Sequence, residues 1–442
     1  METNGKSKRL ITIVKIICFF IVLFLILSPI QHLLQYRNRT TDNFNGQVAN
    51  FYNEEKNTLD AVFIGSSACF SFYSPLLAYN SYGIKTANYC SSGMGAIAYK
   101  YVIEEVRKTQ EDALIVLTVV PNEGMSYQSV HAMSDEMPLS LNKIRFLNKY
   151  FTEDGESIFN SFGFYFTLWE YHDRWSELKA DDFKIDNIKG ANTNSYYLDL
   201  VTDVTEDINI SYDKKEVDNK NLSYIKDLLD YCDEKNENIV FLFPPRNYQE
   251  DKYEQTNTIV DMILDRGYEV LDVRDKANTI GLDYKHDYYD LWHTNIHGSI
   301  KYTDYLVNYI LEKRNCNLDK KSDFELAFSN YQKIIDSKVL DVELNMKNRD
   351  YFLEAPELVS IEQVNNDVSI NWNIVNDADG YCVYRKNDNG WEKVLDVSDS
   401  LNYVDGSCEK NKSYTYTVIS YRNSTDKIYG NYDYKGLTIE VK

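Results

Sequence analysis

The chain has 442 residues, with 68 Asp and Glu against 47 Lys and Arg, and its formal net charge is −21. Nucleic-acid binding needs a basic surface, so this balance argues against a nucleic-acid partner. The seven cysteines are scattered and include no Cys-x-x-Cys, so the sequence predicts neither a zinc ribbon nor a dithiol redox pair. Cys382 and Cys408 could pair near the C-terminus, but spacing alone does not place two cysteines within bonding distance.

The N-terminal segment predicts a membrane anchor. Residues 10–30 are nearly all apolar, with Lys15 as the only charge, and about 20 such residues span a hydrocarbon core. A signal peptide has a shorter apolar core and a small-residue cleavage site, and no clear Ala-x-Ala follows this run, which favours an uncleaved anchor. Basic residues precede the run, although Arg37 and Arg39 follow it. This bias favours residues 1–9 as a cytoplasmic tail and a single-pass protein whose body lies outside the cell membrane.

Residues 31–57 are polar and mixed, and we expect a stalk there. From 58 to 313, short apolar runs alternate with amphipathic stretches, which predicts βαβ units and a parallel, flavodoxin-like α/β sheet. The expected strands are 61–64, 86–90, 114–120, 239–243 and 268–273, and the expected helices are 99–108, 253–264 and 299–313. Ligands of such sheets bind beyond the carboxyl ends of the strands.

A long insertion, at about 123–237, interrupts this pattern and is dense in aromatic residues between 159 and 175. It is either a helical subdomain that packs its own core or a wall that stacks on sugar rings or acyl chains, and both can hold together. Residues 314–353 predict a helical connector, amphipathic from 323 to 335.

From residue 354 to 442 the pattern is all-β. Alternating runs at 368–372, 380–385 and 413–418 predict a small β-sandwich. Its Trp, Gly-Tyr-x-Val-Tyr-Arg and Tyr-x-Tyr-x-Val elements resemble a fibronectin type III module. Such modules are spacers or adhesive units, so we expect their aromatic residues to pack the core and assign them no chemistry.

Two short motifs carry the chemistry: Val62-Phe63-Ile64-Gly65-Ser66-Ser67, and Asp290-Leu291-Trp292-His293-Thr294-Asn295-Ile296-His297-Gly298. A serine hydroxyl is a weak nucleophile until a base takes its proton, and the base needs an acceptor that fixes its tautomer. Ser67 can supply the nucleophile, His293 the base and Asp290 the orienting carboxylate, because Asp-x-x-His lets the last two meet in one short turn.

Each motif alone has an ordinary explanation. A glycine after a strand tolerates positive φ, and a serine there caps the next helix. Asp-x-x-His before a helix is often a cap and a surface histidine. The two motifs together, in this chain order and on an α/β background, favour a hydrolytic site.

These residues resemble the SGNH (GDSL-like) hydrolase family, in which the nucleophile follows the first strand and Asp-x-x-His precedes the last helix. The pattern Asp290-x-x-His293-x-Asn295-x-x-Gly298 is similar to that of a membrane-anchored bacterial branch. That branch includes the teichoic-acid D-alanyl transfer protein and polysaccharide O-acetylation proteins. The resemblance covers about residues 58–340, with looser support from 135–140 and 171–175. Ser66 stands where the family usually has Asp.

The resemblance also implies an oxyanion hole. The Ser67 backbone N–H at a helix start is one donor. Cys90 takes the place of the family's glycine after the second strand, and Asn122 is the only asparagine near the end of the third. The family's Gly-x-Asn-Asp is absent. Arg246 follows the fourth strand and could face a phosphate or carboxylate, or simply lie at the surface.

A zinc site is the rival interpretation of the second motif. His293 and His297 are four apart with Asp290 nearby, a spacing that can bind zinc on one helical face. No Glu stands where a zinc hydrolase has its base, and we expect Gly298 to break the helix. His297 could instead be the base, but the family pattern selects His293, so we predict no metal.

The sequence therefore predicts a membrane-anchored, extracytoplasmic serine esterase or O-acyltransferase that acts on acyl esters of envelope glycans or lipids, without a cofactor. Hydrolysis and transfer use the same residues, so the sequence does not choose between them. An acyl-donating membrane protein is a partner that the resemblance allows. The alternative is a non-catalytic surface-assembly or carbohydrate-binding protein that kept the fold.

Overall fold

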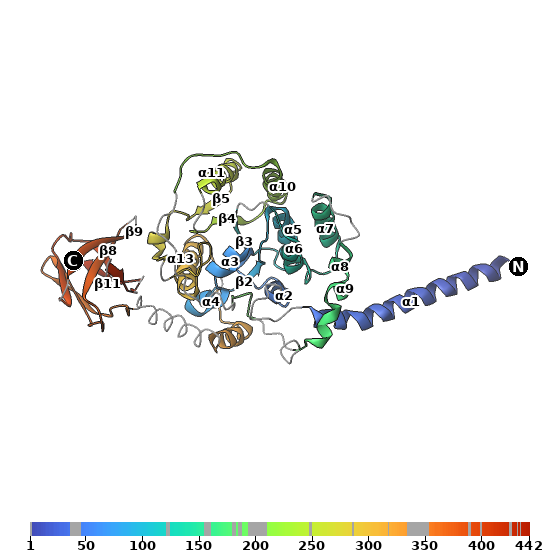
Figure 1. The fold of residues 1–442 in the computed structure, drawn as a ribbon, viewed down its shortest axis with the longest axis horizontal. Coiled ribbons are helices and arrows are strands. Elements are labelled where there is room, and N and C mark those ends of the chain that lie inside the picture. Colours follow the sequence, from blue (N-terminus) through green and yellow to red (C-terminus); the bar gives the residue numbers. More distant parts are fainter. Residues whose placement is uncertain are drawn as a thin grey trace.

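The computed structural model describes residues 2–35, 46–120, 124–153, 161–178, 183, 188–192, 210–246, 250–284, 287–316, 318–333, 353–387, 390–397, 400–423, 427–430, 432–433 and 435–442 (Figure 1).

A five-stranded parallel sheet lies at the centre of the chain, in the order β2-β1-β3-β4-β5. Its strands are β1 (Ala61–Gly65), β2 (Thr86–Cys90), β3 (Leu114–Thr118), β4 (Ile239–Phe243) and β5 (Glu269–Asp272). Every residue of β1 to β4 is buried, as expected for short apolar runs covered on both faces. The α/β prediction is confirmed, and the strand order is the one expected of a flavodoxin-like sheet.

Alternate strand residues point into two separate cores. Val62 and Ile64 of β1 belong to the core under α5 (Ala96–Arg107), α10 (Asn219–Lys235) and α11 (Glu250–Asp265). Ala61 and Phe63 belong to the core under α3 (Ser67–Phe72), α4 (Pro75–Tyr82), α12 (Ala277–Ile280) and α13 (Ile296–Lys313). The sheet is therefore covered by helices on both faces.

The described part of the insertion is helical: α6 (Tyr127–Ser134), α7 (Leu141–Glu153), α8 (Phe162–Tyr165), α9 (Leu168–Tyr171) and the 3₁₀ helix η2 (His172–Ser176). Its buried side chains, among them Met133, Phe146 and Phe164, share the core of the α5 face of the sheet. The sequence analysis allowed a separate hydrophobic core within the insertion. In the structure, the described part of the insertion shares the core of the sheet domain.

The N-terminal segment forms α1 (Glu2–Leu34), which is longer than the apolar run of the sequence. Its part from Ile11 to Leu34, 24 residues, is long and apolar enough to cross a membrane. That part is about 36 Å long at 1.5 Å per residue. Figure 1 shows α1 projecting from the body beside α9.

A polar stalk was predicted over residues 31–57, but the structure has a buried helix in the second half of this range. Residues 46–51 form a short helix, α2 (Gly46–Phe51), in which Val48 and Phe51 are fully buried. Phe51 contacts the ring of Tyr89 in β2, with 5.2 Å between ring centroids. Residues 36–45 of the predicted stalk lie outside the described residues.

The predicted connector contains a helix over 322–333, whose buried Phe324 and Tyr331 pack on the sheet domain. Residues 334–352 lie outside the described part of the chain. The connector is thus held against the sheet domain where it is described.

The C-terminal module consists of two antiparallel sheets, β10-β7-β6 and β12-β11-β8-β9, with β13 added beside β11. Its strands are β6 (Leu358–Val364), β7 (Asp367–Trp372), β8 (Gly380–Asn387), β9 (Gly390–Val397), β10 (Asn402–Asp405), β11 (Lys412–Asn423), β12 (Lys427–Tyr429) and β13 (Leu437–Val441). Trp372, Tyr381 and Tyr416 lie in the core between the sheets, as predicted. Neither Cys382 nor Cys408 is part of a disulfide, so the pairing left open by the sequence does not form.

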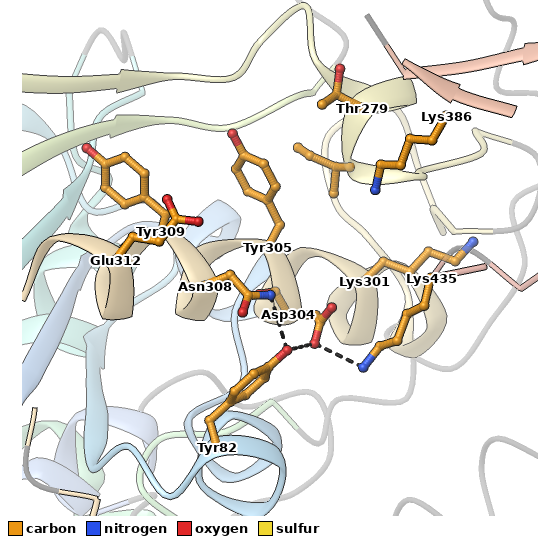
Figure 2. A pocket seen from close by; sticks show the side chains of 11 residues that line it. Tyr82, Thr279, Lys301, Asp304, Tyr305, Asn308, Tyr309, Glu312, Lys386 and Lys435 are labelled. Carbon is orange, nitrogen blue, oxygen red and sulfur yellow. Dashed lines mark hydrogen bonds and ion pairs between the residues drawn. The ribbon is translucent and has the colours of Figure 1, made fainter. Parts of the chain in front are cut away.

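This module docks on α12 and α13 through its last loops. The Tyr432 hydroxyl donates to the Gly281 carbonyl (2.8 Å), and Lys301 Nζ lies 4.8 Å from the centre of the Tyr432 ring. Lys435 forms an ion pair with Asp304 (3.1 Å) at the edge of a cavity of about 490 Å³ between the module and α13 (Figure 2). The module is therefore in contact with the helix that follows His293.

Candidate active site

The first motif turns directly from β1 into α3. Ser66 is the N-cap residue and Ser67 the first residue of α3. Gly65 does not have positive φ, so that explanation of the glycine is wrong. A Cβ at Gly65 would lie 2.9 Å from Thr118 Cβ and 3.0 Å from Cys69 Cβ, so the glycine provides space for α3 and β3 to approach.

The two serines of this turn differ in accessibility. Ser66 is 4% exposed, and its side chain makes no capping hydrogen bond. Ser67 is half-buried. The chain thus presents Ser67, and not Ser66, at the carboxyl edge of the sheet.

The second motif is a closed loop before α13. Tyr288 and Thr294 form an isolated antiparallel bridge, and the Asn295 N–H donates to the Asp287 carbonyl (2.8 Å). The Thr294 hydroxyl donates to the Ser71 carbonyl of α3 (2.7 Å). The loop that carries His293 is therefore fastened to the helix that carries Ser67.

The three predicted catalytic side chains meet in one hydrogen-bonded chain. His293 Nε2 lies 2.7 Å from Ser67 Oγ, and His293 Nδ1 lies 2.9 Å and 2.8 Å from the two carboxylate oxygens of Asp290. An ionised carboxylate only accepts, so Nδ1 carries the proton and Nε2 is free to accept from the Ser67 hydroxyl. This is the tautomer that a general base for Ser67 requires.

The environment keeps Asp290 ionised and His293 in place. Burial raises the pKa of the Asp290 carboxyl, but the hydrogen bond from His293 and the backbone N–H groups of Trp292 (2.7 Å) and His293 (2.8 Å) outweigh it and hold the pKa below its usual range. The ring of Tyr289 lies parallel to the imidazole, with 5.3 Å between centroids. The imidazole of His293 is thus oriented by a carboxylate and by a stacked ring.

A second group of residues supports the loop, and the sequence analysis missed the ion pair within it. Asp287 forms a buried ion pair with Lys301 (2.7 Å). The Asn295 side chain accepts from the N–H groups of His297 (3.0 Å) and Gly298 (3.2 Å) and caps α13. Asn295 and Gly298 were visible in the family pattern, but nothing in the spacing of Asp287 and Lys301 indicated a pair.

Gly298 lies inside the first turn of α13 and does not break the helix, contrary to the prediction. A Cβ there would collide with the Asp287 carbonyl oxygen, so the glycine permits this close approach. His293 precedes α13 and His297 lies in it, so the two do not share one helical face. Among the described residues no three His, Cys, Asp or Glu form a cluster that could hold a metal ion.

The predicted oxyanion donors are placed only in part. Ser67 opens α3, where a backbone N–H has no partner within the helix. Cys90 ends β2 opposite Gly65, and its sulfur is bonded to Cys69 of α3, with 6.3 Å between the Cα atoms. The sequence analysis did not predict this disulfide. Asn122 lies outside the described residues.

Arg246 follows β4 at the same edge of the sheet. The Arg246 backbone N–H donates to the Pro244 carbonyl (3.0 Å), and the neighbouring Pro245 carbonyl accepts a hydrogen bond from the Tyr288 hydroxyl. Arg246 is therefore close in the chain to a residue that touches the histidine loop. Its role in binding stays a prediction.

No protein-family model matches this chain, and no curated protein sequence matches it either. Among solved structures, the chain is similar to "FN3tt mut" (20% identity, 19% of this chain, 92% of that one, TM-score 0.16). It is also similar to pectate lyase PelI from Erwinia chrysanthemi (16% identity, 19% of this chain, 28% of that one, TM-score 0.16). A β-1,2-glucanase from Parabacteroides distasonis matches at 20% identity over 20% of this chain and 13% of that one, with a TM-score of 0.18.

Each of these matches covers about a fifth of this chain. The comparisons give the C-terminal module weak similarity to fibronectin type III domains. They say nothing about the chemistry of the sheet domain.

Proposed function

We propose that this protein is a membrane-anchored, extracytoplasmic serine esterase or O-acyltransferase of the SGNH type, acting on acyl esters of cell-envelope glycans or lipids. The observation that carries the proposal is the Ser67–His293–Asp290 chain, with 2.7 Å between Ser67 Oγ and His293 Nε2. A serine, an imidazole and a half-buried carboxylate in this order form an activated nucleophile.

In the proposed reaction, His293 Nε2 takes the proton from Ser67 Oγ as the oxygen attacks the ester carbonyl carbon. The tetrahedral intermediate collapses, the C–O bond to the alcohol breaks, and His293 returns the proton to the leaving alkoxide. The Ser67 N–H supports the oxyanion, together with donors expected from Cys90 and Asn122. Water or a sugar hydroxyl, deprotonated by His293, then attacks the acyl-enzyme. The bond from the acyl carbon to Ser67 Oγ breaks, His293 returns the proton to Oγ, and an acid or a new ester is released.

The proposed location follows from the apolar stretch Ile11–Leu34 and its preceding basic residues. The bond between Cys69 and Cys90 agrees with it, because disulfides persist in oxidising compartments. Protease added to intact cells should shave off the body. A body that is cut only after lysis would contradict the extracytoplasmic placement.

A fluorophosphonate probe tests the nucleophile, because only an activated serine reacts quickly with it. Wild-type protein should carry the label on Ser67, and Ser67→Ala should abolish labelling and ester turnover. Ser66→Ala is the matched control, since it removes a neighbouring hydroxyl that makes no capping hydrogen bond. Label on Ser66, or equal labelling of Ser67→Ala and wild type, would refute the proposed site.

Acetyl and longer-chain p-nitrophenyl esters should then be compared with and without sugar acceptors. Release of free acid in water indicates hydrolysis, and an acylated sugar indicates transfer. Ordered protein with no turnover and no labelling would instead favour a non-catalytic protein that retains the fold.

A further inference from the structure

The polar end of α1 is fixed to the insertion. Leu34 and Gln35 are buried, and Arg174 of η2, itself only 4% exposed, donates to the carbonyl groups of both. Gln35 Nε2 donates to the Thr167 hydroxyl (2.6 Å) and to the Asp135 carbonyl (3.4 Å). The orientation of α1 relative to the body is therefore set by buried hydrogen bonds, because breaking them would strand buried polar groups.

This docking leaves a cavity of about 980 Å³ between the flank of α1 and the insertion. One wall is apolar helix surface, including Phe20 and Phe24, and the other includes Leu139, Phe162 and Phe166. Lys143 Nζ donates to the Met137 carbonyl (3.2 Å) and so fixes the turn that carries Leu139. The volume lies near the upper end of the roughly 300 to 1,000 Å³ that ligand pockets occupy.

The insertion also exposes large apolar side chains, of which Leu139 and Phe162 line this cavity. Leu139 is 66% exposed, Phe162 54%, Trp169 67% and Trp175 72%. Phe162 contacts the Trp169 ring, with 5.9 Å between centroids. Contiguous exposed apolar groups mark an interaction surface, and tryptophan is enriched where protein meets the membrane–water boundary.

The position of the cavity along α1 indicates the kind of ligand that fits it. Its α1 wall runs from Ile17 to His32, within the stretch that is apolar enough to span a membrane. With α1 placed in the membrane as proposed, hydrocarbon surrounds this stretch, while Gln31, His32 and Glu136 line the same cavity with polar groups. An apolar channel with a polar end matches an acyl chain that leads to a headgroup.

We propose that this groove between α1 and the insertion binds an acyl chain of a membrane lipid. The inference rests on the proposed membrane anchoring and concerns a site separate from Ser67. Bound lipid would hold the insertion against α1 within the membrane and give the proposed catalytic domain direct access to lipid-linked esters.

The test uses full-length protein in phospholipid nanodiscs that contain a phosphatidylglycerol with a diazirine in one acyl chain. After irradiation, labelled peptides are mapped by mass spectrometry. Label should concentrate on residues 137–139 and 162–166 as well as on α1. Leu139→Glu should lower labelling of the two groove peptides on the order of tenfold, because a carboxylate is excluded from hydrocarbon.

Leu141→Glu is the matched control, since Leu141 is 79% exposed, is close in sequence and does not line the cavity. Label on α1 but not on the groove peptides, or equal loss in both variants, would overturn the lipid site and leave the anchor intact. No label on α1 would overturn both. A photo-leucine at position 139 that captures a polypeptide in native membranes would show a partner helix instead.

Discussion

Asp290→Asn removes the feature that gives His293 its catalytic tautomer. An asparagine oxygen can still accept the backbone N–H groups of Trp292 and His293, so the loop should keep its shape. The amide nitrogen, however, donates, and His293 Nδ1 must then accept. The imidazole proton moves to Nε2, where it faces Ser67 Oγ at 2.7 Å and blocks proton abstraction.

The expected loss is on the order of 10⁴ in kcat, as for the same change in other serine triads, which is about 5.5 kcal/mol of barrier. The effect on the free energy of unfolding should be much smaller, about 1 kcal/mol, because the lost bond involves a carboxylate that is partly open to water. This variant should therefore lose nearly all of its activity while keeping most of its folding stability.

The assay combines ester turnover, fluorophosphonate labelling and thermal unfolding of the wild type, Asp290→Asn, Ser67→Ala and the double variant. If the three residues act as a unit, Asp290→Asn should cost nothing further in the Ser67→Ala background. An Asp290→Asn protein with more than about a tenth of wild-type kcat would refute the tautomer argument. Loss of activity together with loss of folded structure would show that Asp290 acts by holding the loop.

Three further outcomes are expected. The pKa of Asp290 lies below its usual range, so its stabilisation should be present above about pH 4 and lost as the pH falls through its folded-state value; Asp290→Asn should flatten this dependence of the melting temperature. Lys301→Met should destabilise the protein by about 3 to 5 kcal/mol in denaturant melts, because it strands the buried charge of Asp287, and adding Asp287→Asn should restore part of the loss. Removing the bond between Cys69 and Cys90 by alanine at both positions should cost about 3 kcal/mol, and an unchanged melting temperature would mean that the bond does not form.

The sheet was predictable because its strands are local signals. Residues 239–243 were expected as a strand and form β4 (Ile239–Phe243), and the expected strand 86–90 is β2 (Thr86–Cys90). The run 239–243 is short and fully apolar, which leaves few alternatives to a buried strand, whereas 86–90 also contains Thr86 and Asn88. The residues of the candidate triad were also nameable, because their chemistry restricts which side chains can act together.

Long-range contacts were not predictable in the same way. Nothing local distinguishes Cys69 and Cys90 from the other cysteines until β1 and β2 pair and bring them to one edge. Arg174 lies in the segment 171–175, which supports the family resemblance only loosely, and its carbonyl partners at the end of α1 are about 140 residues away in sequence. Such pairs depend on the assembled fold, and periodicity carries no information on them.

The candidate site draws on three separate parts of the chain: the start of α3, the end of β2 and the loop before α13. Each part is held independently of the hydrogen bond between Ser67 and His293. The disulfide from Cys69 ties α3 to β2, and the hydroxyl of Thr294 ties the histidine loop to α3. A site held by such supports keeps its geometry when one reacting atom is removed, which is the condition for pre-organised catalysis. We therefore expect single-atom changes at Ser67 or Asp290 to alter the proposed chemistry without unfolding the protein.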